Sequence, residues 1–203
     1  MTPLTFNTLH NHEAKMNQRG AEYPAWIAIC LAAGARSYVE VGCGVGRGLI
    51  LAREAGIEKV VGIDLCPHAP SIFWEERPGD ENLCYVAGDS SSLAVKGMVR
   101  HVCDGGPDAI FIDADHSYGK SKLDYEMWWP QTRLLLGFHD ILIDGSAHVG
   151  RLWDELKYDT RSLELLSRDR RSVLEWQGQG CLDASPDGRI TAGGIGILFK
   201  EDG

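Results

Sequence analysis

Acidic and imidazole side chains follow two apolar runs of the sequence directly. The run AIFI is followed by Asp113, Asp115 and His116, and the run LLLGF is followed by His139 and Asp140. If the two runs are neighbouring parallel strands, Asp113 and Asp140 face one another across a crevice and can bind a hard cation such as Mg²⁺. A histidine of ordinary pKa, about 6.5, can accept the proton of a substrate hydroxyl, a role that we assign to His116.

The same residues also fit roles that involve no chemistry. Asp115 and His116 are typical of residues that cap a following helix, in which case Asp113 touches only a cofactor and no metal is bound. His139 is compatible with a packed side chain that anchors the end of its strand. The residues alone leave these alternatives open.

A glycine-rich turn follows another apolar run, in the segment YVEVGCGVGRG. Gly42, Gly44 and Gly46 permit positive φ angles and a close approach of a ligand to the main chain. Asp64 ends the next apolar run about twenty residues later, where the ribose hydroxyls of a bound nucleoside would lie. Asp89 follows a third run and is placed to contact an adenine. A tight turn without a ligand, and helix caps at the two aspartates, are the alternatives.

These residues resemble the first-strand motif of class I S-adenosylmethionine (SAM)-dependent methyltransferases, which reads as an acidic residue followed by G-x-G-x-G. The resemblance implies that SAM is the cofactor and that Glu40 faces its methionine end. A cofactor that carries a positively charged sulfonium is compatible with a carboxylate beside its binding site. A pyrophosphate would instead prefer the free N–H groups of a helix N-terminus, without a carboxylate nearby. The cofactor-binding residues implied by the resemblance are Glu40, Gly42, Gly44, Gly46, Asp64, Asp89 and Asp113.

The segment 111–140 is similar to a group of methyltransferases that includes macrocin O-methyltransferase-like and cephalosporin-hydroxylase-like proteins. The likeness spans residues 36–156, which is most of the chain. It implies methyl transfer to a hydroxyl of a sugar or another natural-product scaffold, so the expected partner is a small molecule. Residues 1–20, as a lid or arm, and the loop 143–149 are expected to select the acceptor.

The related metal-dependent catechol-type O-methyltransferases add a metal site to this resemblance. In that group an aspartate ends the fourth strand, a basic residue three positions later is the base, and a second acidic ligand ends the fifth strand. Asp113, His116 and Asp140 match these three positions. The group has an asparagine next, which this chain lacks, so the resemblance leaves His139 or Asp115 as the third metal ligand.

Alternating strands and helices must position these residues. Helices are expected at 23–33, 48–55, 90–102 and 149–158, and such alternation predicts parallel pairing with helices on both faces. The last two strands have no crossover helix between them, so an antiparallel C-terminal hairpin is expected at 172–200. The predicted fold is α/β, a Rossmann-like, seven-stranded, mostly parallel sheet in one domain, 1–203. The expected strands are 37–41, 59–63, 83–86, 109–112, 134–138, 172–176 and 194–199.

Composition narrows the partners and the compartment. A net charge of −9 repels phosphate backbones, so a nucleic-acid substrate is disfavoured. The six cysteines contain no C-x-x-C pair and are expected to be reduced. No apolar run approaches the roughly 18 residues of a membrane span, and the N-terminus lacks a signal peptide. We therefore expect a cytoplasmic protein, as a monomer or a homo-oligomer.

Two other functions remain compatible with the sequence. An NAD-linked oxidoreductase also needs a glycine-rich turn and an acidic residue such as Asp64, although Arg47 stands where G-x-G-x-x-G requires a glycine. A non-catalytic cofactor-binding module would keep the sheet without the reaction. The grouping of Asp113, His116 and Asp140 favours an enzyme over such a module.

Overall fold

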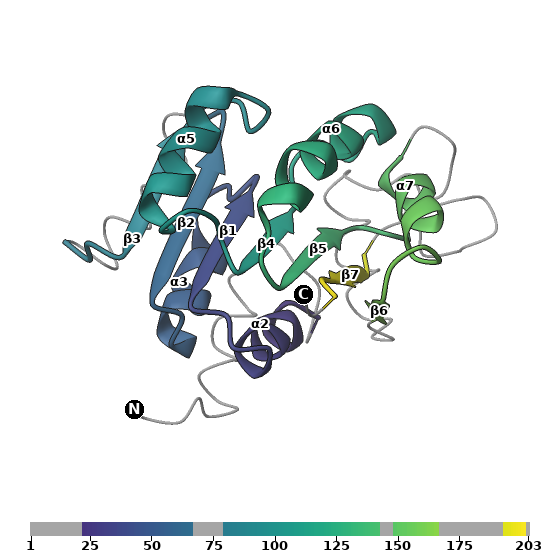
Figure 1. The fold of residues 1–203 in the computed structure, drawn as a ribbon, viewed down its shortest axis with the longest axis horizontal. Coiled ribbons are helices and arrows are strands. Elements are labelled where there is room, and N and C mark those ends of the chain that lie inside the picture. Colours follow the sequence, from purple (N-terminus) through teal and green to yellow (C-terminus); the bar gives the residue numbers. More distant parts are fainter. Residues whose placement is uncertain (1–21, 67–78, 143–147, 167–192, 202–203) are drawn as a thin grey trace, which may run out of the picture.

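The computed structural model describes residues 22–66, 79–142, 148–166 and 193–201, which form one seven-stranded sheet with helices on its two faces (Figure 1). The predicted N-terminal lid, residues 1–20, lies outside the described residues. The strands are β1 (Ser37–Val41), β2 (Lys59–Asp64), β3 (Leu83–Ala87), β4 (Ala109–Ile112), β5 (Leu135–His139), β6 (Ser162–Leu165) and β7 (Ile195–Phe199). The helices are α2 (Glu22–Ala32), α3 (Arg47–Ala55), α5 (Leu93–Val102), α6 (Tyr118–Trp128) and α7 (Val149–Leu156), with a short 3₁₀ turn, η1 (Trp129–Gln131).

The strand order is β3-β2-β1-β4-β5-β7-β6, and the first five strands in this order run parallel. The order reverses between β1 and β4, because β2 and β3 lie on one side of β1 and the later strands lie on the other. In open α/β sheets, ligands bind beyond the carboxyl ends of the strands at such a switch point. The predicted pairing of the fourth and fifth strands is confirmed, since Ile112 aligns with Phe138.

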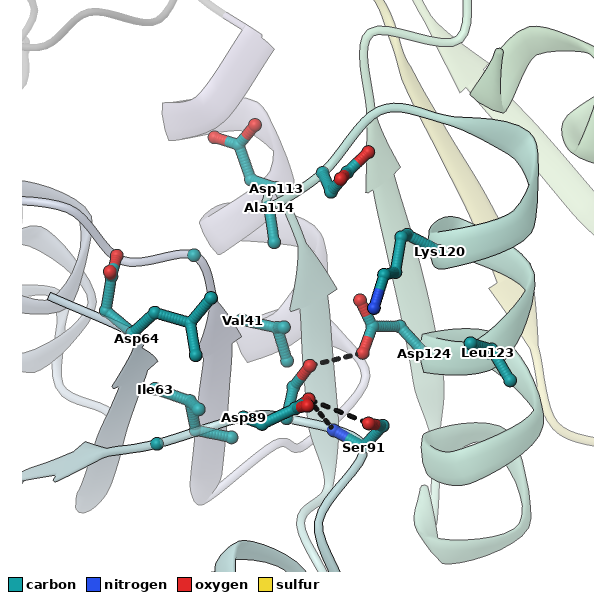
Figure 2. Close-up of a pocket in the computed structure, with 15 residues that line it drawn as sticks. Val41, Ile63, Asp64, Asp89, Ser91, Asp113, Ala114, Lys120, Leu123 and Asp124 are labelled. Carbon is teal, nitrogen blue, oxygen red and sulfur yellow. Dashed lines mark hydrogen bonds between the residues drawn. The ribbon is translucent and has the colours of Figure 1, made fainter. Parts of the chain in front are cut away.

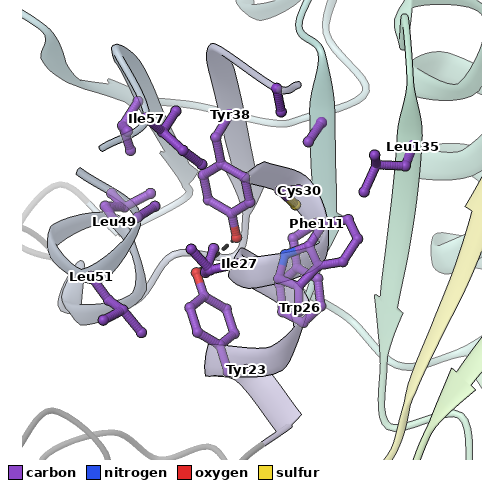
Figure 3. Close-up of a cluster of buried hydrophobic side chains, with 14 of the residues drawn as sticks. Tyr23, Trp26, Ile27, Cys30, Tyr38, Leu49, Leu51, Ile57, Phe111 and Leu135 are labelled. Atoms are coloured by element: carbon purple, nitrogen blue, oxygen red, sulfur yellow. Dashed lines mark hydrogen bonds between the residues drawn. The ribbon is translucent and has the colours of Figure 1, made fainter. Parts of the chain in front are cut away.

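Side chains of β1 alternate between the two faces of the sheet, as a strand with period two requires. Tyr38 belongs to the cluster that α2 and α3 cover, and Val39 belongs to the cluster that α5, α6 and α7 cover. Figure 3 shows the first cluster, in which the ring of Trp26 stacks on Phe111 with centroids 5.6 Å apart. Burial of these aromatic rings is a main source of hydrophobic stabilisation for the α2 layer.

The antiparallel C-terminal pair is confirmed, but its first strand differs from the predicted one. β7 pairs with β5 on one side and with β6 on the other, both antiparallel. The partner is therefore Ser162–Leu165, and the predicted strand 172–176 lies outside the described residues. Most of β6 is exposed, so it lacks the apolar signal on which the prediction relied.

Helix boundaries follow local capping. α5 begins at Leu93 and not at residue 90, because Ser92 is its N-cap and accepts a hydrogen bond from the nitrogen of Ala94 at 3.2 Å. α3 ends at Ala55, and Gly56, with φ of 112°, caps it in the left-handed conformation. The cysteines among the described residues are free thiols. None of the described helices is long and apolar enough to cross a membrane.

Candidate active site

The glycine-rich turn between β1 and α3 depends on backbone conformations that favour glycine. Gly42, Gly44 and Gly46 have φ angles of 84°, 50° and 82°. A Cβ on Gly42 would collide with the backbone carbonyl of Asp113 and would lie 2.6 Å from the Cα of Ala114. Gly42 therefore lets the turn after β1 touch the turn after β4, which places both beside the switch point.

Asp64, at the end of β2, fixes the glycine turn through its carboxylate. One oxygen accepts a hydrogen bond from the nitrogen of Gly44 at 2.9 Å, and the other accepts one from the nitrogen of Cys66 at 2.9 Å. Each carboxylate oxygen has a further lone pair with which it can accept a ribose hydroxyl. The predicted ribose position of Asp64 is compatible with this geometry.

A pocket of about 370 Å³ opens at the carboxyl ends of β1 to β4 and against α6 (Figure 2). Of the predicted cofactor residues, Gly42, Asp64, Asp89 and Asp113 line it, whereas the other three do not. Lining residues that the sequence analysis did not single out come from the strand ends, the turn after β3, and α6. They are Val41, Ile63, Leu65, Gly88, Ser90, Ser91, Ala114, Lys120, Leu123 and Asp124.

Glu40, predicted to face the methionine end, is 2% exposed and points to the α2 side of the sheet. It accepts hydrogen bonds from the hydroxyls of Tyr23 at 2.6 Å and Tyr38 at 3.3 Å. Burial, and then the charge of Asp113, raises the pKa of Glu40 to about 8, although the two tyrosine hydroxyls lower it. A methionine contact for Glu40 stays a prediction.

Asp113 lies at the centre of a cluster of imidazoles and carboxylates beside the pocket. Its Oδ1 is 2.9 Å from Nδ1 of His139 and 3.3 Å from Nε2 of His116. Nε2 of His116 also lies 3.4 Å from Oδ2 of Asp140, whose Oδ1 is 3.6 Å from His139. The predicted residues are therefore brought together, three of them from the ends of β4 and β5 and one, His116, from the turn after β4.

The two carboxylates control the protonation of both histidines. The hydrogen bond that His116 donates to Asp113 is the main cause that raises the pKa of His116 above 6.5, and Asp140 adds to it against the effect of burial. Burial lowers the pKa of His139, but Asp113, Asp140 and Glu22 together outweigh it and raise the pKa to about 9. A pKa of about 9 keeps a proton on the imidazole of His139 at neutral pH when no other cation is bound.

Backbone geometry fixes the outer members of this cluster. Asp140 has a φ of 58°, which is uncommon for a residue with a side chain, and its Oδ1 accepts a hydrogen bond from the nitrogen of Gly193 at 2.6 Å. Asp115 instead accepts a hydrogen bond from the nitrogen of Ser117 at 2.8 Å, before α6. The N-cap of α6 is Ser117, so Asp115 closes the turn before the helix and does not cap it, whereas His116 faces the carboxylates.

Within the described residues, one set of potential metal ligands has all its ligand atoms within 4.8 Å of one another: Asp113, His116 and His139. The predicted metal set contained Asp113, His139 and Asp140. His116, predicted as the base, therefore lies close enough to be a ligand too. Asp115, the other option for a third ligand, is not a member of this set.

Comparison with known proteins identifies the family. Residues 39–141, just over half of the chain, match the family described as "Methyltransferase domain". A comparison with curated proteins found no match. The chain belongs to this methyltransferase domain family.

Solved structures of low sequence identity share the fold. A Thermoplasma acidophilum protein has a TM-score of 0.60 at 13% identity, with 95% of each chain covered. A Staphylococcus aureus protein, described provisionally as a caffeoyl-CoA O-methyltransferase, has a TM-score of 0.58 at 14% identity, with 98% of this chain and 93% of that chain covered. An O-methyltransferase from Bacillus cereus, in complex with S-adenosylhomocysteine (SAH), has a TM-score of 0.52 at 16% identity, with the same coverages.

The family match and the fold together confirm the resemblance to class I SAM-dependent methyltransferases. The pocket lies at the carboxyl ends of β1 to β4, beside the switch point at which ligands bind in open α/β sheets. The family match favours this cofactor over NAD, which the glycine-rich turn alone had left open.

Proposed function

We propose that this methyltransferase transfers the methyl group of SAM to a hydroxyl oxygen of a small molecule, with His116 as general base. The observation that carries the proposal is the position of His116, whose Nε2 lies 3.3 Å from Asp113 and 3.4 Å from Asp140. Asp113 also lines the pocket. The base therefore lies next to the place from which the methyl group would come.

The carboxylates orient His116 for proton transfer. When Nε2 carries a proton and donates it to Asp113, Nδ1 is the acceptor nitrogen of the neutral ring. A substrate hydroxyl that donates to this nitrogen loses its proton as its oxygen attacks the methyl group, and SAH leaves with the electron pair of the broken carbon–sulfur bond. Asp113 and Asp140, which raise the pKa of the ring, stabilise the imidazolium that forms.

A divalent cation fits the remaining members of the cluster. We propose that Asp113, Asp140 and His139 hold it, because two carboxylates and one imidazole suit Mg²⁺ or Mn²⁺. When bound, such a cation lowers the pKa of a nearby hydroxyl. Without it, the proton on His139 offsets part of the negative charge of the two carboxylates, so metal and proton compete for this imidazole.

A small-molecule acceptor agrees with the charge of the chain. The net charge of −9 disfavours a phosphate backbone, and the structurally similar Staphylococcus and Bacillus proteins are described as O-methyltransferases. A hydroxyl is a weak nucleophile until it loses its proton, so it is an acceptor that makes use of a general base such as His116.

The proposal is tested by transfer of a radiolabelled methyl group from SAM to a panel of phenols, catechols and sugars. His116→Gln should reduce turnover about 100-fold or more and leave SAH affinity within about twofold. His101→Gln, an exposed histidine at the end of α5, is the matched control and should be unchanged. Full activity of the His116 variant, or methylation of amines alone, would contradict the proposal.

A second measurement separates the base from the metal ligands. Titration with Mn²⁺, followed by electron paramagnetic resonance, should show a bound cation in wild type and in His116→Gln, and none in Asp113→Ala or His139→Ala. Loss of the cation from the His116 variant as well would assign His116 as a ligand and remove it as the base.

A further inference from the structure

One buried carboxylate in the cofactor pocket has no role in the mechanism above. Asp124, on α6, is 5% exposed and lines the pocket. It lies on the buried face of α6 together with Ser121 and Trp128. A carboxylate removed from water is costly unless it accepts hydrogen bonds, so its position in a pocket wall calls for a donor.

The turn after β3 supplies one donor to this carboxylate. The hydroxyl of Ser90 donates a hydrogen bond to Oδ1 of Asp124, which joins α6 to that turn (Figure 2). Burial raises the pKa of Asp124, while Ser90 lowers it. The Ser90–Asp124 hydrogen bond could serve only to hold α6 against the turn after β3. A role in ligand recognition predicts, in addition, that Asp124 discriminates between ligands.

Asp89, the residue predicted to contact adenine, is occupied differently. It is exposed, and its Oδ1 accepts hydrogen bonds from the backbone nitrogen of Ser91 at 2.9 Å and from the Ser91 hydroxyl at 2.7 Å. Its carboxylate therefore closes the turn after β3. Asp124 is the more desolvated of the two carboxylates, and a desolvated acceptor discriminates more strongly between ligands.

The order of groups along the pocket places the base of the cofactor beside Asp124. Asp113 lines the pocket and also contacts His116, so the sulfonium belongs at that end of the pocket. Asp64, at the end of β2, is assigned to the ribose hydroxyls. The remaining wall is formed by the turn after β3 and by α6. Leu123 on α6 and Leu65, which directly follows β2, are 48% and 75% exposed, line the same pocket and offer apolar surfaces to a flat ring.

We propose that Asp124, oriented by Ser90, accepts a hydrogen bond from the exocyclic amine of adenine and thereby selects an adenosine cofactor. A base that carries a carbonyl oxygen at this position would place an acceptor against a carboxylate. The assignment depends on neither the metal nor the methyl acceptor, because it concerns cofactor binding alone.

The test compares the affinities of SAH and S-inosylhomocysteine, in which a carbonyl oxygen replaces the exocyclic amine, by isothermal titration without metal or acceptor. Wild type should bind SAH about 10- to 100-fold more tightly, the range expected for a hydrogen bond to a charged group. Asp124→Asn should reduce this ratio to within about threefold of unity, because an amide can donate to the carbonyl. Glu126→Gln, which removes an exposed charge from the same helix, should keep the ratio.

Three results would overturn the assignment. The first is equal affinity of wild type for the two ligands. The second is an Asp124→Asn protein that loses affinity for both ligands but keeps their ratio, as a purely structural link predicts. The third result applies if the Asp124→Asn protein is unstable, in which case Ser90→Ala is measured instead. Ser90→Ala should lower the affinity ratio of the two ligands at least threefold, and an unchanged ratio would refute the assignment. Failure of SAH itself to bind would instead contradict the cofactor assignment, so the two failures are distinguishable.

Discussion

Gly42→Ala is the substitution that most directly tests how the glycine turn positions the site. An L-residue in the left-handed conformation costs about 1–2 kcal/mol, and Gly42 has a φ of 84°. The new Cβ would also overlap the backbone of Asp113 and Ala114. Backbone atoms cannot rotate away, so overpacking adds about 1–3 kcal/mol. The expected loss in unfolding free energy is about 2–5 kcal/mol, a large part of the 5–15 kcal/mol that a domain typically has.

Gly44→Ala is the matched control for this change. Gly44 also has a positive φ, of 50°, but a Cβ there would meet no atom of the protein within 4 Å. Only the conformational cost of about 1–2 kcal/mol is expected. Urea unfolding of both variants, without cofactor, gives the comparison. Equal losses would refute the argument that contact between the turns after β1 and β4 sets the requirement for Gly42.

Two further substitutions test buried hydrogen bonds. Asp108 accepts hydrogen bonds from the backbone nitrogens of Arg36 at 2.8 Å and Ser37 at 2.9 Å. Asp108→Ala should therefore lower the unfolding free energy, measured in urea, by about 2–4 kcal/mol. SAH affinity should not change, because this end of the sheet is opposite the pocket. A loss below about 0.5 kcal/mol would contradict a stabilising role of these hydrogen bonds. Burial raises the pKa of Glu40 to about 8, whereas a glutamate in the unfolded chain has a pKa of about 4.3. Between these two pH values the folded state binds more protons than the unfolded state, so the unfolding free energy falls as pH rises. Glu40→Gln should remove at least about 1 kcal/mol of that fall in urea titrations at pH 5.5 and 8, and an unchanged slope would show that Glu40 is ionised in the folded protein.

Much of the parallel sheet could be predicted from the sequence, because its buried strands are apolar on both faces. The strand β4 (AIFI) is fully buried and was predicted with its observed bounds. In contrast, β6 (SLEL) is a mostly exposed edge strand, held by backbone pairing with β7. Its pattern carries little burial signal, so the sequence could not reveal that it completes the sheet.

The grouping of side chains at the strand ends was predictable for the same reason. Asp113, His139 and Asp140 come directly at the ends of two buried strands, and parallel pairing brings such ends together. The orientation of Glu40 could not be foreseen, because it depends on Tyr23, a residue of another element that donates to its carboxylate.

Asp124 was missed because one polar residue in a helix usually faces solvent. A signal was nonetheless present in the spacing. Ser121, Asp124 and Trp128 are three and four residues apart, which places them on one face of a helix. The large apolar Trp128 marks that face as the buried one, so a carboxylate on it was a candidate for a pocket wall.

The most direct test of the central claim is isothermal titration of the purified protein with SAH, after chelation and again with added Mg²⁺ or Mn²⁺. The account predicts binding in the micromolar range in each condition, and a separate metal heat that Asp113→Ala and Asp140→Ala abolish. Absence of SAH binding in every condition would contradict the assignment of the pocket to this cofactor, and with it the proposed reaction.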